Sequence, residues 1–178
     1  MSDQEPTRTV NIAGYGLPAL PWSGPRDLLA SCTPRTGTPF FLGTCGPDGR
    51  PHAAGIGALW LDGDLYFVSG PATRKSRDLA ANPASTVSAR LPGFDLVLEG
   101  EAARVTDRET LERAAAIYRE GGWPAEVEGD AFTAPYSAPS AGPPPWHLYR
   151  LRLDTAIGLA TEAPAGAMRW HFDHSGRR

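Results

Sequence analysis

The 178-residue sequence has few cysteines, no long hydrophobic run and no excess of basic charge. Its two cysteines, Cys32 and Cys45, are too few for a disulfide framework and match no metal-binding or CxxC spacing, so we expect two reduced thiols. The longest nearly apolar segment, 53–61, is far shorter than the ~18 residues that a membrane span needs. The first residues include acids and no apolar core, so they do not form a secretory signal. We therefore expect a cytoplasmic protein that does not act at a membrane.

The charge balance argues against a nucleic-acid partner. A net charge of −3 at pH 7 lacks the basic stripe that non-specific nucleic-acid binding requires. The length suits one domain with a proper core and leaves little room for a second. We divide the chain into an N-terminal extension, residues 1–24, which lies over the surface and is held there by Trp22, and a single cofactor-binding domain, residues 25–178.

Lysine is almost absent as well. Lys75 is the only lysine, whereas sixteen arginines supply the other basic side chains. Few lysines among many Ala, Gly, Pro and Arg residues are typical of a genome rich in G and C. A lysine retained where arginine is the easy substitute indicates a position that needs an ammonium group.

The apolar pattern predicts a mainly β protein that begins with an antiparallel meander. Strands are expected over 39–45, 50–61 and 65–68, joined by tight turns at 46–49 and 62–64. Further strands are expected over 85–91, 94–106, 146–161 (one or two strands) and 168–172. Six to eight antiparallel strands with a few helices in the connections predict a β-barrel, which leaves no open sheet edges.

Two short helices are predicted in the first half of the chain. Residues 26–32 follow Pro25, a residue that suits the first helical position. A second helix over 74–81 begins after Thr73 as its N-cap. It ends at an Asn-Pro pair, because the residue before a proline is pushed out of the helical conformation.

A third helix is predicted over 107–120. Thr106 and Glu109 fit a capping box at its start, and a pair of glycines follows its end. Its apolar face carries Leu111, Ala114, Ala115 and Tyr118.

The segment 70–76 combines the groups that bind phosphate. Free N–H groups and the dipole at a helix start favour an anion. Arg74 adds a planar bidentate donor, Lys75 adds a compact charge, and Thr73 and Ser76 add hydroxyls. The alternative is a solvated basic turn, which the pattern alone favours because short basic motifs often occur by chance.

The preceding strand has an unusual run of small residues. Gly55 and Gly57 share one face, and Ala54, Ile56 and Ala58 share the other. Glycine inside a strand marks a bulge or the close approach of a ligand or another backbone. A flat ring with a phosphate tail would fit the strand and the following loop together, whereas the alternative is a tightly packed barrel corner.

The run from Thr44 to Pro83 resembles the core of the pyridoxamine 5′-phosphate oxidase-like proteins, the flavin and deazaflavin split barrels. The resemblance extends from Phe40 to about Arg104 and rests on an ordered series: D-G-R-P, a strand of small residues, Y-F, T-R-K and N-P. It implies a split β-barrel of the FMN-binding type. It also implies the cofactor-binding residues Ala54, Ile56, Gly57, Ala58, Ser69, Thr73, Arg74, Lys75 and Trp170.

Within that family, the resemblance gives each part of the site a role. Arg74 and Lys75 correspond to the pair that binds the cofactor phosphate, and Ser69 to a residue that contributes a hydrogen bond. The strand 54–59 corresponds to the one that lies along the isoalloxazine ring, largely through its backbone.

The sequence departs from the oxidase that gives the family its name. That enzyme has cationic residues at both ends of the ring-facing strand, where this chain has Ala54 and Leu59, so vitamin B6 oxidation is not expected. The chain is more similar to the actinobacterial branch, whose members are homodimers with the cofactor at the interface. Many of them use the deazaflavin F420, while others hold FMN or bind a cofactor without turnover. Arg169 and Trp170 stand at that branch's C-terminal Arg-Trp motif and either reach the cofactor or seal the barrel.

The segment 123–146 is a candidate lid. It holds six prolines and the aromatic residues Trp123, Phe132, Tyr136 and Trp146. Long connections of this kind are often lids, so the aromatic side chains are candidates for an apolar substrate pocket. Packing against a dimer partner is the alternative.

No side chain is expected to act as a catalytic group. The histidines have no metal-ligand spacing, and there is no nucleophile motif. The predicted function is an oxidoreductase that transfers hydride between bound F420 and a small unsaturated substrate, with the chemistry supplied by the cofactor. The alternatives are an FMN-dependent oxidoreductase of the same fold and a carrier that binds the cofactor without turnover.

Overall fold

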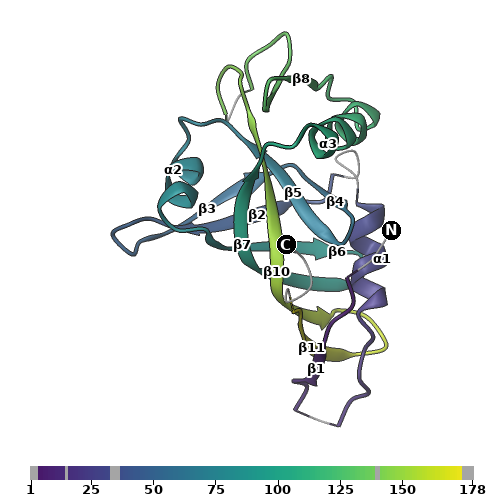
Figure 1. The fold of residues 1–178 in the computed structure, drawn as a ribbon. Helices are drawn as coiled ribbons and strands as arrows, with labels where there is room; N and C mark the ends of the chain where they lie inside the picture. The colour runs from purple at the N-terminus through teal and green to yellow at the C-terminus, as the bar shows by residue number, and fades with distance from the viewer. Residues whose placement is uncertain (1–3, 15, 33–36, 139–140, 174–178) are drawn as a thin grey trace.

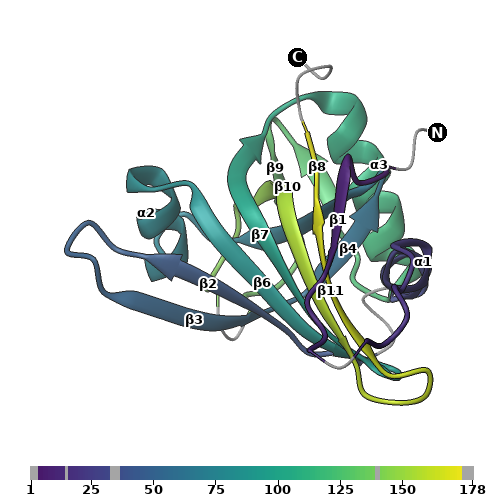
Figure 2. The same ribbon diagram turned by 90° about the horizontal axis from the view of Figure 1, so that it is seen from below.

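The computed structural model describes residues 4–14, 16–32, 37–138 and 141–173. These residues form three helices, a nine-stranded antiparallel sheet and a small two-stranded sheet (Figures 1 and 2). The helices are α1 (Ser23–Ser31), α2 (Arg74–Ala81) and α3 (Arg108–Glu120). The strands are β1 (Arg8–Asn11), β2 (Phe40–Cys45), β3 (Pro51–Ile56), β4 (Ala58–Leu61), β5 (Asp64–Ser69), β6 (Ala84–Leu91), β7 (Phe94–Val105), β8 (Glu126–Glu128), β9 (Ala131–Thr133), β10 (His147–Ala160) and β11 (Gly166–His171).

The long strand β10 joins the parts of the main sheet. The main path runs β1-β11-β10-β7-β6-β2-β3, and β5, which carries β4, also pairs with β10. The first five residues of β10 pair with β5, and residues 155–160 pair with β11. The sheet therefore closes around a core as a split β-barrel, which confirms the mainly β fold predicted from the sequence.

The strand predicted over 50–61 is two strands. The chain breaks at Gly57, so that β3 pairs with β2 while β4 pairs with β5. A methyl group placed on Gly55 or Gly57 would meet no other atom within 4 Å, so this corner is open rather than tightly packed. The split raises the strand number of the main sheet above the expected six to eight. So does β1, which the N-terminal extension adds to the edge of β11.

The helix boundaries correct two details of the sequence prediction. Thr73 is the N-cap of α2 as predicted, and its hydroxyl accepts a hydrogen bond from the Ser76 amide. The N-cap of α3 is Asp107 rather than Thr106, because the Asp107 carboxylate accepts from the Thr110 amide at 2.9 Å. Helix α1 begins at Ser23, before the proline that was expected to precede it.

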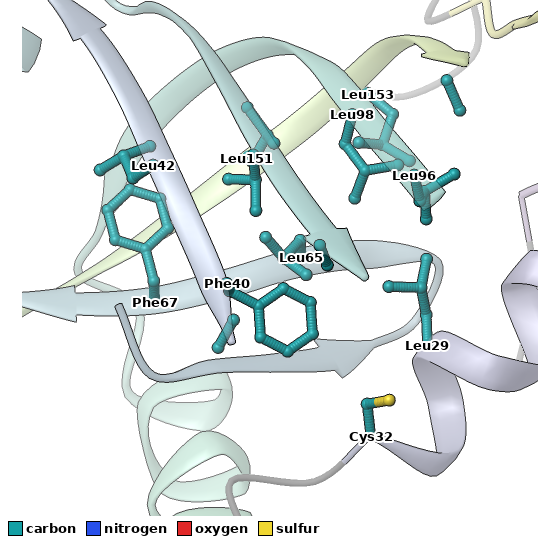
Figure 3. Close-up of a cluster of buried hydrophobic side chains, with 14 of the residues drawn as sticks. Leu29, Cys32, Phe40, Leu42, Leu65, Phe67, Leu96, Leu98, Leu151 and Leu153 are labelled. Carbon is teal, nitrogen blue, oxygen red and sulfur yellow. The ribbon is translucent and has the colours of Figure 1, made fainter. Parts of the chain in front are cut away.

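The barrel core is filled by side chains from every part of the sheet and is closed at one end by α1. Figure 3 shows Leu29 and Cys32 of α1 beside side chains from β2, β5, β7 and β10. Trp22 belongs to this core, and its indole N–H donates to the Gln4 carbonyl at 3.1 Å. The N-terminal segment is thus held as predicted.

A second hydrophobic cluster lies between α3, the β4–β5 hairpin and the segment 123–146. It includes Leu59, Tyr66, Leu111, Tyr118 and Phe132, all of them buried. Helix α2 lies on the other side of the barrel from α1, beside β2 and β3 (Figures 1 and 2). The end of β5 therefore connects α2 with the region covered by α3. None of the helices in the described ranges is both long and apolar enough to cross a membrane.

Candidate functional site

The turn between β5 and α2 is fixed by a network of hydroxyl groups. Ser69 at the end of β5 shares a hydrogen bond of 2.8 Å with Thr73, and the Ser76 hydroxyl donates to Ser69 at 2.8 Å. The Thr73 and Ser76 hydroxyls also lie 2.9 Å from the Gly70 carbonyl oxygen, to which both can donate. Ser69 is completely buried. These hydroxyls hold the start of α2 against the end of β5.

Lys75, one residue into α2, is a buried cation. It is 7% exposed, and burial lowers the pKa of its ammonium group. No carboxylate in the described part of the chain offsets this effect or pairs with the ammonium. Burying a charge without a counter-ion costs free energy, so this position favours an anionic ligand.

Arg74 faces a different environment from its neighbour. Its guanidinium pairs with the Asp78 carboxylate at 3.7 Å, and the buried Asp78 also accepts a hydrogen bond of 2.9 Å from the Thr44 hydroxyl. Successive helix residues point about 100° apart, which separates the two cations. The sequence suggested one cationic pair, but the structure places only Lys75 in the cavity described next.

Lys75 lines a cavity of about 260 Å³ between the β3–β4 corner and the aromatic residues that follow α3. A methyl group would find open space at both glycines of the corner, so a flat group can approach the backbone there. The lining residues are Gly55, Ile56, Gly57, Val68, Lys75, Tyr118, Trp123, Ala138, Ala141 and Trp146.

The aromatic wall is a packed cluster rather than a loose loop. Trp123 packs edge-on against Tyr118 at 4.9 Å and against Trp146 at 5.6 Å between ring centroids. The backbones of Phe132 and Trp146 exchange two hydrogen bonds, of 2.7 and 2.9 Å. Of the four aromatic residues predicted for a pocket, Trp123 and Trp146 line the cavity. Phe132 is buried behind them and Tyr136 is exposed.

The predicted site residues fall into three groups. Ile56, Gly57 and Lys75 meet in the cavity, and Ser69 and Thr73 shape the turn beside it. Three others are not among the lining residues: Ala54 lies on β3, Ala58 is buried in the barrel core, and Arg74 pairs with Asp78.

Trp170 also lies outside the cavity. It is completely buried in the barrel core, with its ring 5.4 Å from that of Trp22. Gly158 has no side chain because a methyl group there would collide with Phe94 and Trp170. Of the two interpretations of the Arg-Trp motif, this geometry supports sealing of the barrel by Trp170.

Two residues of the site were missed from the sequence. Tyr118 shares the apolar face of α3 with leucine and alanine, so it was assigned to the core, and only its hydroxyl hinted at another role. Asp78 lies four residues after Arg74, a spacing that places both on one helix face and could have indicated the pair.

Other hollows and clusters offer weaker candidates. A groove of about 790 Å³ lies over β2, β3 and β6, but none of the predicted site residues lines it. Across the described ranges, no group of three or more His, Cys, Asp or Glu side chains could hold a metal ion.

Comparison with protein families supports the same assignment. Residues 33–154 match the family model described as pyridoxamine 5′-phosphate oxidase. No curated protein sequence matches the chain.

Solved structures share the fold. One is a pyridoxamine 5′-phosphate oxidase-related, FMN-binding protein from Nostoc punctiforme, 18% identical, with a TM-score of 0.60 over 89% of this chain and 94% of that one. Another is a conserved hypothetical protein from Mycobacterium tuberculosis, 16% identical, with a TM-score of 0.60 over 84% and 91%. A third is an F420 reductase, 20% identical, with a TM-score of 0.52 over 74% and 94%. Identities this low show the fold alone.

Proposed function

The chain belongs to the pyridoxamine 5′-phosphate oxidase family, and from this premise we propose that it is an F420-dependent oxidoreductase. The deazaflavin ring lies against the β3–β4 corner, and an anionic group of the cofactor pairs with Lys75. Hydride passes between the cofactor and a small unsaturated substrate. The placement within the actinobacterial branch is part of the same proposal.

One observation carries this proposal: an unpaired, buried ammonium lines the same cavity as two glycines with open space in front of them. An anionic tail would neutralise Lys75, and a planar ring would cover the exposed backbone of Gly55 and Gly57. The donor set and the shape of the cavity therefore fit a phosphate-bearing flavin-type cofactor.

The protein's own groups would bind, orient and exclude water. Lys75 supplies charge, the hydroxyls of Ser69, Thr73 and Ser76 keep the start of α2 rigid, and Trp123 and Trp146 shield the cavity from solvent. A bound deazaflavin or flavin supplies the hydride chemistry. No side chain of the cavity is assigned a proton-transfer role.

FMN is the second candidate cofactor. The FMN-binding protein from Nostoc punctiforme has a higher TM-score than the F420 reductase, although both identities are low. A carrier that binds either cofactor without turnover is the third reading.

A titration separates these alternatives. Absorbance and fluorescence titrations of the purified protein with F420 and with FMN should give saturable binding, tighter for F420. Reoxidation of the reduced cofactor by unsaturated substrates then tests for an enzyme. Absence of binding for both cofactors would refute the proposal, and binding without reoxidation by any substrate or by oxygen would favour a carrier.

We also propose a homodimer in which a second copy covers the outer face of the sheet. Phe41 on β2 and Leu159 on β10 are each about half exposed, at 51% and 50%. Both line a hollow of about 470 Å³ with Val97 and Ile157. Exposed apolar patches of this kind mark interaction surfaces. Strand β3 adds an uncovered edge, since none of its residues is buried.

A further inference from the structure

Two hydrogen-bonding groups in the cavity wall have no partner. The Tyr118 hydroxyl and the Trp146 indole nitrogen are buried atoms without a hydrogen bond to any described residue. Both side chains are only 2% exposed, and both line the cavity. Nearly all buried polar groups in folded proteins have a partner, so each such exception needs an explanation.

Packing alone does not explain them. The ring of Tyr118 packs against Trp123 at 4.9 Å and against Phe132 at 6.0 Å. A phenylalanine would make the same contacts without burying a hydroxyl, because that hydroxyl bonds to nothing in the described chain. An unpaired buried donor costs folding free energy, which a partner in a bound ligand would offset.

The polar side chains of the cavity are all suited to donate. An indole N–H is only a donor, and an ammonium is only a donor. Burial raises the pKa of Tyr118, so its phenol stays protonated and can donate as well. The remaining lining side chains are apolar, from Ile56, Val68, Trp123, Ala138 and Ala141.

We propose that Tyr118 and Trp146 are specificity-determining residues that bind an acceptor oxygen, such as a carbonyl oxygen, on a planar and otherwise apolar ligand. Lys75 is reserved for the anionic group. The inference rests on the proposed function for the two sources of this oxygen: the ring system of the cofactor, or a separate small substrate.

The position of the unpaired donors matters as much as their lack of partners. The Trp170 indole nitrogen is also buried and unpartnered, but Trp170 lies in the barrel core. No ligand role follows there. At Tyr118 and Trp146, the missing partner coincides with a space of about 260 Å³ that can hold one.

The test compares Tyr118→Phe with the matched control Tyr136→Phe, which removes a hydroxyl from an exposed tyrosine that does not line the cavity. The probes are acetophenone and α-methylstyrene, which have the same shape but carry C=O and C=CH₂ respectively. Binding is followed by ligand-detected NMR, and F420 and FMN are titrated into the same variants. Trp146→Phe is compared with Trp123→Phe, which loses the same ring volume from the same cavity.

The expected result is a preference of the wild type for acetophenone over α-methylstyrene. Tyr118→Phe should weaken binding of the oxygen-bearing ligand about three- to tenfold, the usual effect of one hydrogen bond. It should leave α-methylstyrene binding and the melting temperature unchanged or raise the latter. Trp146→Phe should reduce the preference more than Trp123→Phe.

The outcomes distinguish the source of the oxygen. A loss confined to acetophenone assigns the oxygen to a separate molecule, and a loss confined to F420 or FMN assigns it to the cofactor. The inference is overturned if Tyr118→Phe changes no affinity more than Tyr136→Phe does, or if it lowers the melting temperature clearly. Preference for acetophenone without any cofactor binding would support this inference while refuting the proposed function.

Discussion

Thr44 on β2 donates a hydrogen bond of 2.9 Å to the buried carboxylate of Asp78 on α2. The bond ties the helix that carries Lys75 to the sheet. Asp78 also pairs with Arg74, so one carboxylate fixes both the position of α2 and the direction of the guanidinium.

Removing this carboxylate should loosen the helix. Asp78→Ala leaves the Thr44 hydroxyl without its partner, and we expect a loss of about 1–3 kcal/mol in the free energy of unfolding, measured by urea denaturation. Asp95→Ala is the control, because the Arg90–Asp95 pair is much more exposed and should contribute little. Equal effects of the two substitutions would contradict the role assigned to Asp78.

Removing the ammonium should weaken cofactor binding without unfolding the protein. Lys75→Met deletes a charge-assisted contact to the cofactor's anionic group, and we expect affinity to fall about ten- to hundredfold. Lys75→Arg keeps the charge and should fall less. Fluorescence titration gives the affinities, and circular dichroism checks the fold.

The same substitution should change stability with pH in a defined direction. Burial lowers the pKa of Lys75 below its ordinary value of 10.5, so between these values the unfolded chain binds more protons and stability rises with pH. Lys75→Met lacks this cost, so the cofactor-free variant should be at least as stable as wild type at neutral pH. Its advantage should shrink as the pH approaches 10.5. An advantage that stayed constant up to that pH would count against a buried, unpaired ammonium.

A side chain at the β3–β4 corner should block the ring without harming the fold. Gly57→Val enters open space, so we expect the free energy of unfolding to change by less than about 1 kcal/mol. Cofactor affinity should fall at least tenfold. Gly158→Ala provides the contrast, because its methyl group collides with Phe94 and Trp170 and should destabilise the barrel. Normal cofactor affinity in Gly57→Val would place the ring elsewhere.

Charge on the outer sheet face should separate the proposed dimer. Phe41→Glu and Leu159→Glu each introduce a carboxylate into an apolar interface, and light scattering coupled to size exclusion should show monomers. Tyr136→Glu, at an exposed aromatic residue outside that face, should remain dimeric. A monomeric wild-type protein would end this part of the account.

The sequence identified the fold and part of the site, for physical reasons that differ between residues. Alternating strands, turn glycines and the Thr73 cap are local signals, and the structure agrees with them. The break at Gly57 was missed because it depends on which strands β3 and β4 choose as neighbours, and that is a property of the closed sheet. The separation of Arg74 from Lys75 depends on helix direction relative to the barrel, which adjacent sequence positions do not reveal.

Tyr118 shows the same limit from the opposite side. Its place on the apolar face of α3 is what helical spacing predicts, and the structure confirms that it is buried. What spacing cannot show is the cavity beside its hydroxyl, because the β3–β4 corner and the segment around Trp146 come from distant parts of the chain.

A crystal structure of the protein with bound F420 or FMN tests the central claim most directly. The account predicts an anionic group of the cofactor beside the Lys75 ammonium and the ring against the backbone of residues 55–57. A cofactor bound elsewhere, with this cavity filled by the protein's own side chains, would contradict it.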